Sequence, residues 1–182
     1  MIRDTGFDPS IRVVAYDPTW PLAFEREAAA LRQVLGALVV RVDHVGSTSV
    51  PGLAAKPIVD IQVSVPAIAP LEPYQRPLEA RGYLFVPDPE FPDYPFFGMP
   101  AAPPRTHHVH VCAVGSAHER RHLALRDYLR AHPAEAEAYA AEKRAVAARY
   151  AGNALAYVTA KGPYVQALER RALAWARGEA SV

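Results

Sequence analysis

Residues 58–65 read IVDIQVSV, and from Val59 onward apolar and polar side chains alternate strictly. Side chains that alternate in this way project to opposite faces of a β-strand. The apolar face consists of Val59, Ile61, Val63 and Val65, and the polar face of Asp60, Gln62 and Ser64. Such a strand needs a sheet with one buried face, so the pattern predicts a fold built around a β-sheet with a row of polar groups on its other face.

Helical and strand patterns alternate along the rest of the chain. Residues 17–36 and 67–82 predict helices, the second shortened or kinked by Pro77. Strands are predicted over residues 39–45, 58–65, 83–87, 94–99 and 106–114. Three more helices are predicted over residues 116–132, 134–151 and 159–177, the first opened by the capping box SAHE. This order predicts an α/β or α+β fold, with helices packed on one face of a mixed sheet and a helical C-terminal part.

Charge and hydropathy remove several classes of function. The 20 basic and 19 acidic residues leave a net charge of +1, which favours neither a nucleic-acid nor a membrane partner. No apolar run approaches the ~18 residues of a membrane span, and the opening MIRDTGFDPSIRVV lacks the apolar stretch of a signal peptide. The single cysteine, Cys112, cannot form an internal disulfide. We expect one cytoplasmic domain over residues 1–182. The sequence leaves its oligomeric state open.

The segment before the alternating strand, DHVGSTSVPGLAAK, is rich in small and polar residues. Gly46 directly follows a predicted strand, where a glycine lets the backbone approach a ligand closely. The N–H groups nearby and the hydroxyls of Ser47, Thr48 and Ser49 are suited to hold phosphate oxygens. The alternative is a tight turn without a ligand.

Three cations are the candidates to neutralise a phosphate: Lys56, Arg105 and Lys161. Lys161 lies near the start of the last predicted helix, where a cation opposes the helix dipole. A cation in that position usually has an anion nearby, which is either a carboxylate or a bound phosphate.

A carboxylate and three histidines form a candidate metal site. Asp60 can hold Mg²⁺ or Mn²⁺ against a triphosphate, or it can simply pair with Lys56. His108 and His110 lie at i and i+2 on one face of a predicted strand, and His44 is on the strand before the glycine. Imidazoles with a carboxylate favour Zn²⁺, Mn²⁺ or Fe²⁺. The alternatives are a solvated strand face, or histidines that orient a substrate.

These motifs resemble a known family. A Gly–Ser pair after a strand, followed by an aspartate on the next strand, resembles the signature of the nucleotidyltransferase superfamily. More closely, HVGSTSVPGLAAKPIVDI, RTHHVHV, LRDYLRAHP and residues 157–161 resemble the GrpB family, from about Val13 to Trp175. The resemblance implies a nucleotidyltransferase-like fold with its core at about residues 13–177. The superfamily pattern falls on Gly46, Ser47 and Asp60 and departs at Gln62, where a second metal-binding acid is expected.

Three functions follow as hypotheses. The first is nucleotidyl transfer to a small acceptor, with Asp60 and His110 as the catalytic residues and a divalent metal on Asp60. The second is a module that binds a nucleotide or coenzyme precursor without transfer, which Gln62 favours because a neutral amide is a poor metal ligand. The third is a phosphohydrolase that uses a His/Asp metal site.

Overall fold

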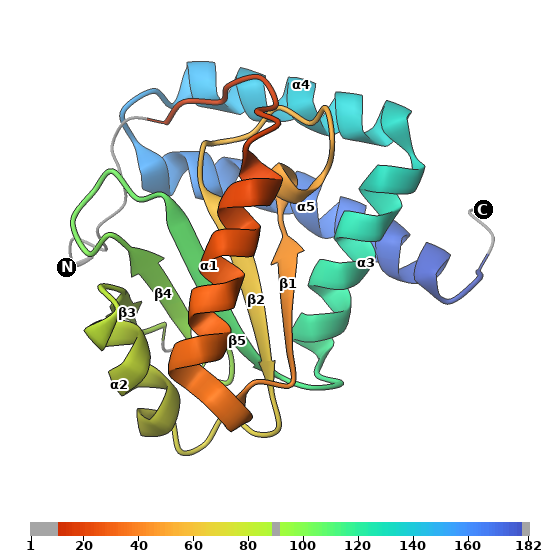
Figure 1. The fold of residues 1–182 in the computed structure, drawn as a ribbon. Coiled ribbons are helices and arrows are strands. Elements are labelled where there is room, and N and C mark those ends of the chain that lie inside the picture. The colour runs from red at the N-terminus through yellow and green to blue at the C-terminus, as the bar shows by residue number, and fades with distance from the viewer. Residues whose placement is uncertain (1–10, 89–91, 180–182) are drawn as a thin grey trace.

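A computed structural model describes residues 11–88 and 92–179. Its centre is a five-stranded sheet in the order β1-β2-β5-β4-β3 (Figure 1). The strands are β1 (Arg41–Val45), β2 (Val59–Val65), β3 (Leu84–Val86), β4 (Phe96–Met99) and β5 (His107–Ala113). The central pair, β2 and β5, is parallel and the other pairs are antiparallel. The prediction of a mixed sheet is confirmed.

The helices are α1 (Trp20–Leu35), α2 (Glu72–Ala80), α3 (Ala117–Ala131), α4 (Pro133–Arg149) and α5 (Ala154–Ala176), with short 3₁₀ turns η1 (Gly36–Leu38) and η2 (Ser47–Ser49). The capping box forms as predicted, because the Oγ of Ser116 accepts the N–H of Glu119 at 3.2 Å. The last helix begins earlier than expected, since Asn153 caps it through the N–H of Ala156. Within the two described ranges, no helix is long and apolar enough to cross a bilayer.

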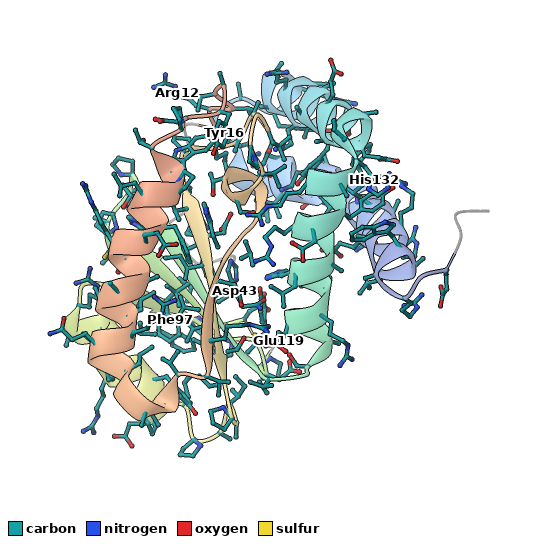
Figure 2. The ribbon with its side chains drawn as sticks, turned by 45° about the vertical axis from the view of Figure 1, so that its right-hand side comes forward. Arg12, Tyr16, Asp43, Phe97, Glu119 and His132 are labelled. Atoms are coloured by element: carbon teal, nitrogen blue, oxygen red, sulfur yellow. The ribbon has the colours of Figure 1, made fainter. Side chains whose placement is uncertain are left out.

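The apolar face of the sheet is covered by α1 and α2. The alternating residues of β2 lie in one buried cluster with Leu31 of α1, Leu78 of α2 and Phe97 of β4. Figure 2 shows Phe97 on the side of the sheet that faces α1. The alternation in IVDIQVSV therefore places its apolar side chains where the sequence predicts.

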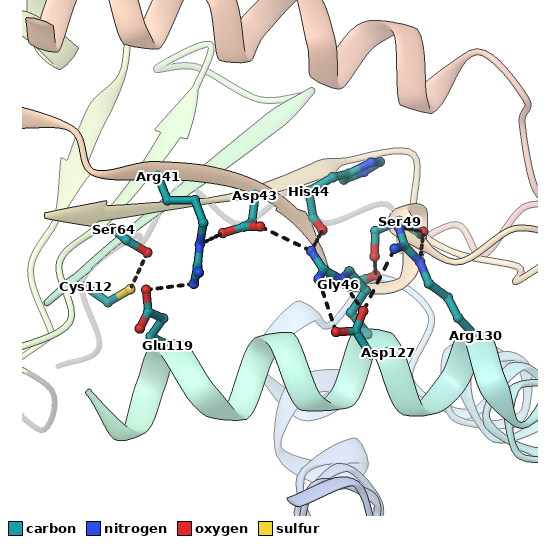
Figure 3. Close-up of polar contacts among 11 residues, drawn as sticks. Arg41, Asp43, His44, Gly46, Ser49, Ser64, Cys112, Glu119, Asp127 and Arg130 are labelled. Atoms are coloured by element: carbon teal, nitrogen blue, oxygen red, sulfur yellow. Dashed lines mark hydrogen bonds and ion pairs between the residues drawn. The ribbon is translucent and has the colours of Figure 1, made fainter. Parts of the chain in front are cut away.

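The second face of the sheet is also covered, so the expectation of helices on one face alone is wrong. Helix α3 lies against this face and α5 runs behind the sheet in Figure 1, and Gln62 and Ser64 are fully buried there. The contacts are ionic and polar: Arg41 of β1 donates to Glu119 of α3 at 2.8 Å (Figure 3). Polar side chains on a strand usually face water, so the pattern predicts a solvated face, whereas here a second helical layer covers these residues.

Candidate functional site

The turn after β1 brings the backbone against Asp60. Val45, the last residue of β1, pairs with Asp60 of β2, and Gly46 then turns the chain with φ of 67°. A Cβ on Gly46 would overlap the Oδ2 atom of Asp60. Glycine is therefore needed twice, for the left-handed conformation and for the close approach of the carboxylate.

A cavity of about 310 Å³ opens between this turn and the two C-terminal helices. We call it the lysine-lined cavity. Its polar lining comes from η2, β2, β5, α4, α5 and the residues before β2, and consists of Ser47, Thr48, Lys56, Asp60, His108, Lys143 and Lys161. Its apolar wall consists of Ala55, Ile58, Phe96, Tyr157 and Val158. Residues far apart in the sequence thus form one small polar site with an apolar side.

Lysines are concentrated in this cavity. The chain has 20 basic residues, of which only Lys56, Lys143 and Lys161 are lysines, and all three line the cavity. The Nζ of Lys143 donates to the Oγ of Ser47 at 2.8 Å and to the carbonyl of Ala54. The lining includes a single carboxylate, that of Asp60, so the positive charges outnumber the negative one.

The two helical lysines differ in their protonation. Burial, aided by the charges of Lys161 and Arg144, lowers the pKa of Lys143 to about 7. Burial also acts to lower the pKa of Lys161, but the Tyr139 and Tyr157 phenols and the Asp60 carboxylate outweigh it and raise that pKa. Lys161 is therefore charged at neutral pH, and Lys143 is balanced between its charged and neutral forms.

Two histidines hold the Asp60 carboxylate. The Oδ1 of Asp60 lies 3.2 Å from Nδ1 of His108 and 3.6 Å from Nε2 of His110. Burial would raise the pKa of Asp60, but hydrogen bonds from the two imidazoles outweigh it and hold this pKa far below its usual range. Burial lowers the pKa of His108, partly offset by Asp60. Asp60 thus stays ionised and orients His108, which lines the cavity.

His44 does not join this group. It pairs with Ile61 of β2 and therefore projects to the opposite face from Asp60, where its ring stacks on Phe24 at 4.8 Å and its Nε2 meets the Oγ1 of Thr48 at 3.0 Å. Burial lowers its pKa to about 4, so it is neutral. Strand geometry therefore separates His44 from the other predicted metal ligands, Asp60, His108 and His110.

A metal centre of the usual kind does not fit the residues present. Gln62 occupies the position of the second acid, fully buried, and neither atom of its amide has a hydrogen-bond partner in the described part of the chain. Among residues 11–88 and 92–179, no three His, Cys, Asp or Glu side chains are placed to hold a metal ion. Asp60 alone offers one carboxylate, whereas Mg²⁺ and Ca²⁺ require several oxygen ligands.

Three other predicted residues lie differently from expectation. Arg105 is buried against Gly98, where an added Cβ would meet its guanidinium, and it is not part of the cavity lining. His110 also lies outside the lining, with its ring stacked on Tyr94 at 5.2 Å. Lys161 lies about two turns inside α5, not at its start, because the helix begins at Ala154. The dipole argument for Lys161 was therefore wrong, although the residue does line the cavity.

Lys143 was missed by sequence reasoning. It lies in the alanine-rich segment AEAEAYAAEKRAVAARY, where a Lys–Arg pair resembles an ordinary solvated helix face. The available signal was the scarcity of lysine: with three lysines in 182 residues, each was a candidate for a specific role. The sequence analysis identifies Lys56 and Lys161 as candidates, and the structure adds Lys143 as the third lysine of the cavity.

Arginines of α3 hold the turn from outside the cavity (Figure 3). Arg130 donates from Nε and Nη2 to the carbonyl of Ser49, at 3.1 and 2.7 Å. Arg126 donates to the carbonyl of His44 at 3.3 Å and is itself paired with Asp127 at 2.7 Å. Backbone carbonyls before and after Gly46 are therefore bound by cations of one helix.

We expect Arg130→Ala to loosen the turn without unfolding the protein. The loss of a partly exposed, charge-assisted hydrogen bond should lower the free energy of unfolding by about 1 kcal/mol. Hydrogen exchange at residues 46–50 should accelerate, while exchange in β2 stays unchanged. The control is Arg76→Ala, which removes an exposed arginine from α2. Equal exchange at residues 46–50 in both variants would show that Arg130 does not hold the turn.

Comparisons with known proteins concern the family and the fold. The sequence profile of the family described as GrpB protein matches residues 10–171. UPF0157 protein PA4798 of Pseudomonas aeruginosa is 42% identical over 93% of this chain and 71% of its own length. UPF0157 protein YqkA of Bacillus subtilis is 33% identical over 92% of this chain, and a dephospho-CoA kinase of Mycolicibacterium paratuberculosis 34% identical over 91%. The chain spans about half the length of these last two, 49% and 47%.

Solved structures support the fold. The crystal structure of the conserved protein GrpB from Enterococcus faecalis superposes with a TM-score of 0.81 at 37% identity, covering 89% of this chain and 97% of that one. The Cid1 poly(U) polymerase, solved with MgGTP bound, superposes with a TM-score of 0.51 at 15% identity, covering 75% and 45%. The likeness to this polymerase shows a shared nucleotidyltransferase-like fold and nothing further about activity.

Proposed function

This chain belongs to the GrpB family, and we propose that its lysine-lined cavity binds the phosphate groups of a nucleotide or a coenzyme precursor. The observation that carries this proposal is the gathering of every lysine in the chain around one cavity. Ammonium groups are compact donors that recur in phosphate sites. Four of the relatives bear the name dephospho-CoA kinase and the polymerase of similar fold binds a nucleotide, which supports a ligand of this chemical class.

The cavity offers separate contacts for the two ends of such a ligand. Phosphate oxygens would accept hydrogen bonds from Lys56, Lys143, Lys161 and the Ser47 hydroxyl. The apolar wall, which includes Phe96 and Val158, would face the uncharged part of the molecule. A volume of about 310 Å³ lies at the lower end of the ~300–1,000 Å³ common for small-molecule sites, so we expect part of a nucleotide to extend beyond the cavity.

Nucleotidyl transfer and binding without transfer are both compatible with this ligand. The Asp60–His108 contact favours transfer, because a carboxylate that orients a neutral imidazole prepares it to accept a proton from an acceptor hydroxyl. Gln62 favours binding alone, because the usual second acid is absent from this position. Release of pyrophosphate from a bound triphosphate would decide between them. The phosphohydrolase hypothesis loses support, since the described residues form no three-ligand metal site.

A thermal-shift panel tests the proposal. Nucleoside triphosphates, coenzyme A precursors and pyrophosphate would each be added to the purified protein, with and without Mg²⁺, Mn²⁺ or Zn²⁺. A ligand that binds only the folded state raises the unfolding midpoint. We expect a shift that is lost in Lys161→Met and kept in Arg170→Met, which removes an exposed cation from the same helix. A shift that survives in Lys161→Met would place the ligand elsewhere.

Ligand affinity should depend on pH through Lys143. Its pKa of about 7 means that its charge is present below neutrality and is lost as pH rises, and an anion binds the charged form. Affinity for pyrophosphate should therefore fall by about tenfold between pH 7 and pH 9. Calorimetry across this pH range should show that the affinity of Lys143→Met for pyrophosphate depends less on pH than that of the wild type. An equal slope in the variant would exclude Lys143 as the titrating group.

A further inference from the structure

We infer that the lysine-lined cavity holds the phosphate chain of its ligand without a divalent cation. The inference rests on the proposed function and concerns how the charge of the phosphates is neutralised. It departs from the polymerase of similar fold, which was solved with the magnesium complex of its nucleotide. The basis is the donor set of the cavity, where three ammonium groups accompany one carboxylate.

One oxygen of this carboxylate is already engaged, and the other lies against the Gly46 turn. The Oδ1 atom of Asp60 contacts His108 and His110 at 3.2 and 3.6 Å. The Oδ2 atom lies beside the turn, close to where a Cβ on Gly46 would stand. A cation at Asp60 would have to displace these contacts and would find the neutral amide of Gln62 in place of a second acid.

The lysines supply the missing positive charge. Lys143 reaches the cavity from α4 and Lys161 from α5, and Lys56 comes from the segment just before β2. The three lysines come from three separate segments of the chain, and Lys56 and Lys161 each lie 5.5 Å from the ring of Tyr157. With Asp60 subtracted, two net positive charges remain when all three lysines are protonated, which matches the charge of a phosphate dianion.

This arrangement assigns Asp60 a positioning role. Its carboxylate orients His108 and repels phosphate, whereas in a metal-dependent site the same carboxylate would attract the metal–phosphate complex. The two accounts therefore predict opposite effects of removing its charge. Asp60→Asn should bind phosphate more tightly if the lysines act alone, and should lose binding if a metal bridges Asp60 and the ligand.

Calorimetry with pyrophosphate separates these outcomes. The full chain would be titrated in EDTA and in 1 mM free Mg²⁺, as wild type, Asp60→Asn and Glu25→Gln. Glu25 is an exposed carboxylate on α1, on the opposite side of the sheet, so its variant controls for the loss of one negative charge. We expect binding in EDTA, affinity equal or lower in Mg²⁺, a gain of about threefold to tenfold in Asp60→Asn and no change in Glu25→Gln.

Two results would overturn the inference. The first is a gain of more than tenfold on adding Mg²⁺ to the wild type, which needs no variant and decides the matter even if Asp60→Asn unfolds. The second is loss of binding in an Asp60→Asn protein whose unfolding midpoint is unchanged. A separate result, no binding of pyrophosphate or of any nucleotide in either buffer, would overturn the proposed function itself.

Discussion

Lys143→Met together with Lys161→Met is expected to weaken phosphate binding by more than a hundredfold. Each lysine would donate a charge-assisted hydrogen bond to the ligand, worth about 2 kcal/mol, or roughly thirtyfold in affinity. The two side chains face the same small cavity, so their effects need not add fully. A nucleotide or pyrophosphate that binds the wild type at micromolar concentration should give no measurable heat with this double variant.

Two control variants distinguish the loss of contacts in the cavity from a change in net charge alone. Arg149→Met removes an exposed cation from α4 and Arg170→Met removes one from α5, so each reproduces the change in net charge outside the cavity. Lys143→Met also leaves the Ser47 hydroxyl and the Ala54 carbonyl without their donor, so the unfolding midpoint of each protein must be measured as well. Wild-type affinity in a folded double variant would refute the assignment of the cavity.

Gly46→Ala is expected to destabilise the fold by about 2–4 kcal/mol. Gly46 has φ of 67° and ψ of −171°, a conformation that is essentially restricted to glycine and costs other residues about 1–3 kcal/mol. The remainder comes from the overlap between the new Cβ and the Oδ2 of Asp60, which forces β2 and the turn apart. Denaturant unfolding measures the loss, and ligand binding should fall with it because Ser47 moves with the turn.

Gly36→Ala is a matched control for this prediction. Gly36 also has a positive φ, 55°, but a Cβ there would meet nothing within 4 Å. It should therefore show the backbone cost alone. In the double variant with Asp60→Ala, the contacts with Oδ2 and Cγ are removed and only the Cβ contact at 3.0 Å remains, so the cost of Gly46→Ala should fall toward that of Gly36→Ala. If Gly46→Ala costs no more than Gly36→Ala beside an intact Asp60, the close contact is without energetic consequence.

The sheet could be predicted because local patterns determine its strands. The alternation in residues 58–65 identifies β2 and its apolar face, and the capping box at Ser116 marks the start of α3. The second helical layer could not be predicted in this way. Gln62 and Ser64 are polar and yet fully buried, because α3 returns over them from 50 or more residues later in the chain.

The site residues that depend on the pattern of a single strand could be predicted from the sequence. Those that depend on the register between strands, or on helices far away in the chain, could not. Asp60 was placed on the polar face by alternation alone, and its contact with His108 follows from the parallel pairing of β2 with β5. Whether His44 shares that face depends on the register of β1, which no local pattern reveals. Lys143 reaches Ser47 across 96 positions, a contact that only the packing of α4 creates.

The most direct test of the account is lysine footprinting. Acetic anhydride would modify Lys56, Lys143 and Lys161 in the presence and absence of a saturating nucleoside triphosphate or pyrophosphate, with each site quantified by mass spectrometry. Because every lysine lines the same cavity, we expect a bound phosphate ligand to slow acylation at all three positions together. Unchanged acylation at all three, in protein that calorimetry shows to be saturated, would contradict the assignment of this cavity as the phosphate site.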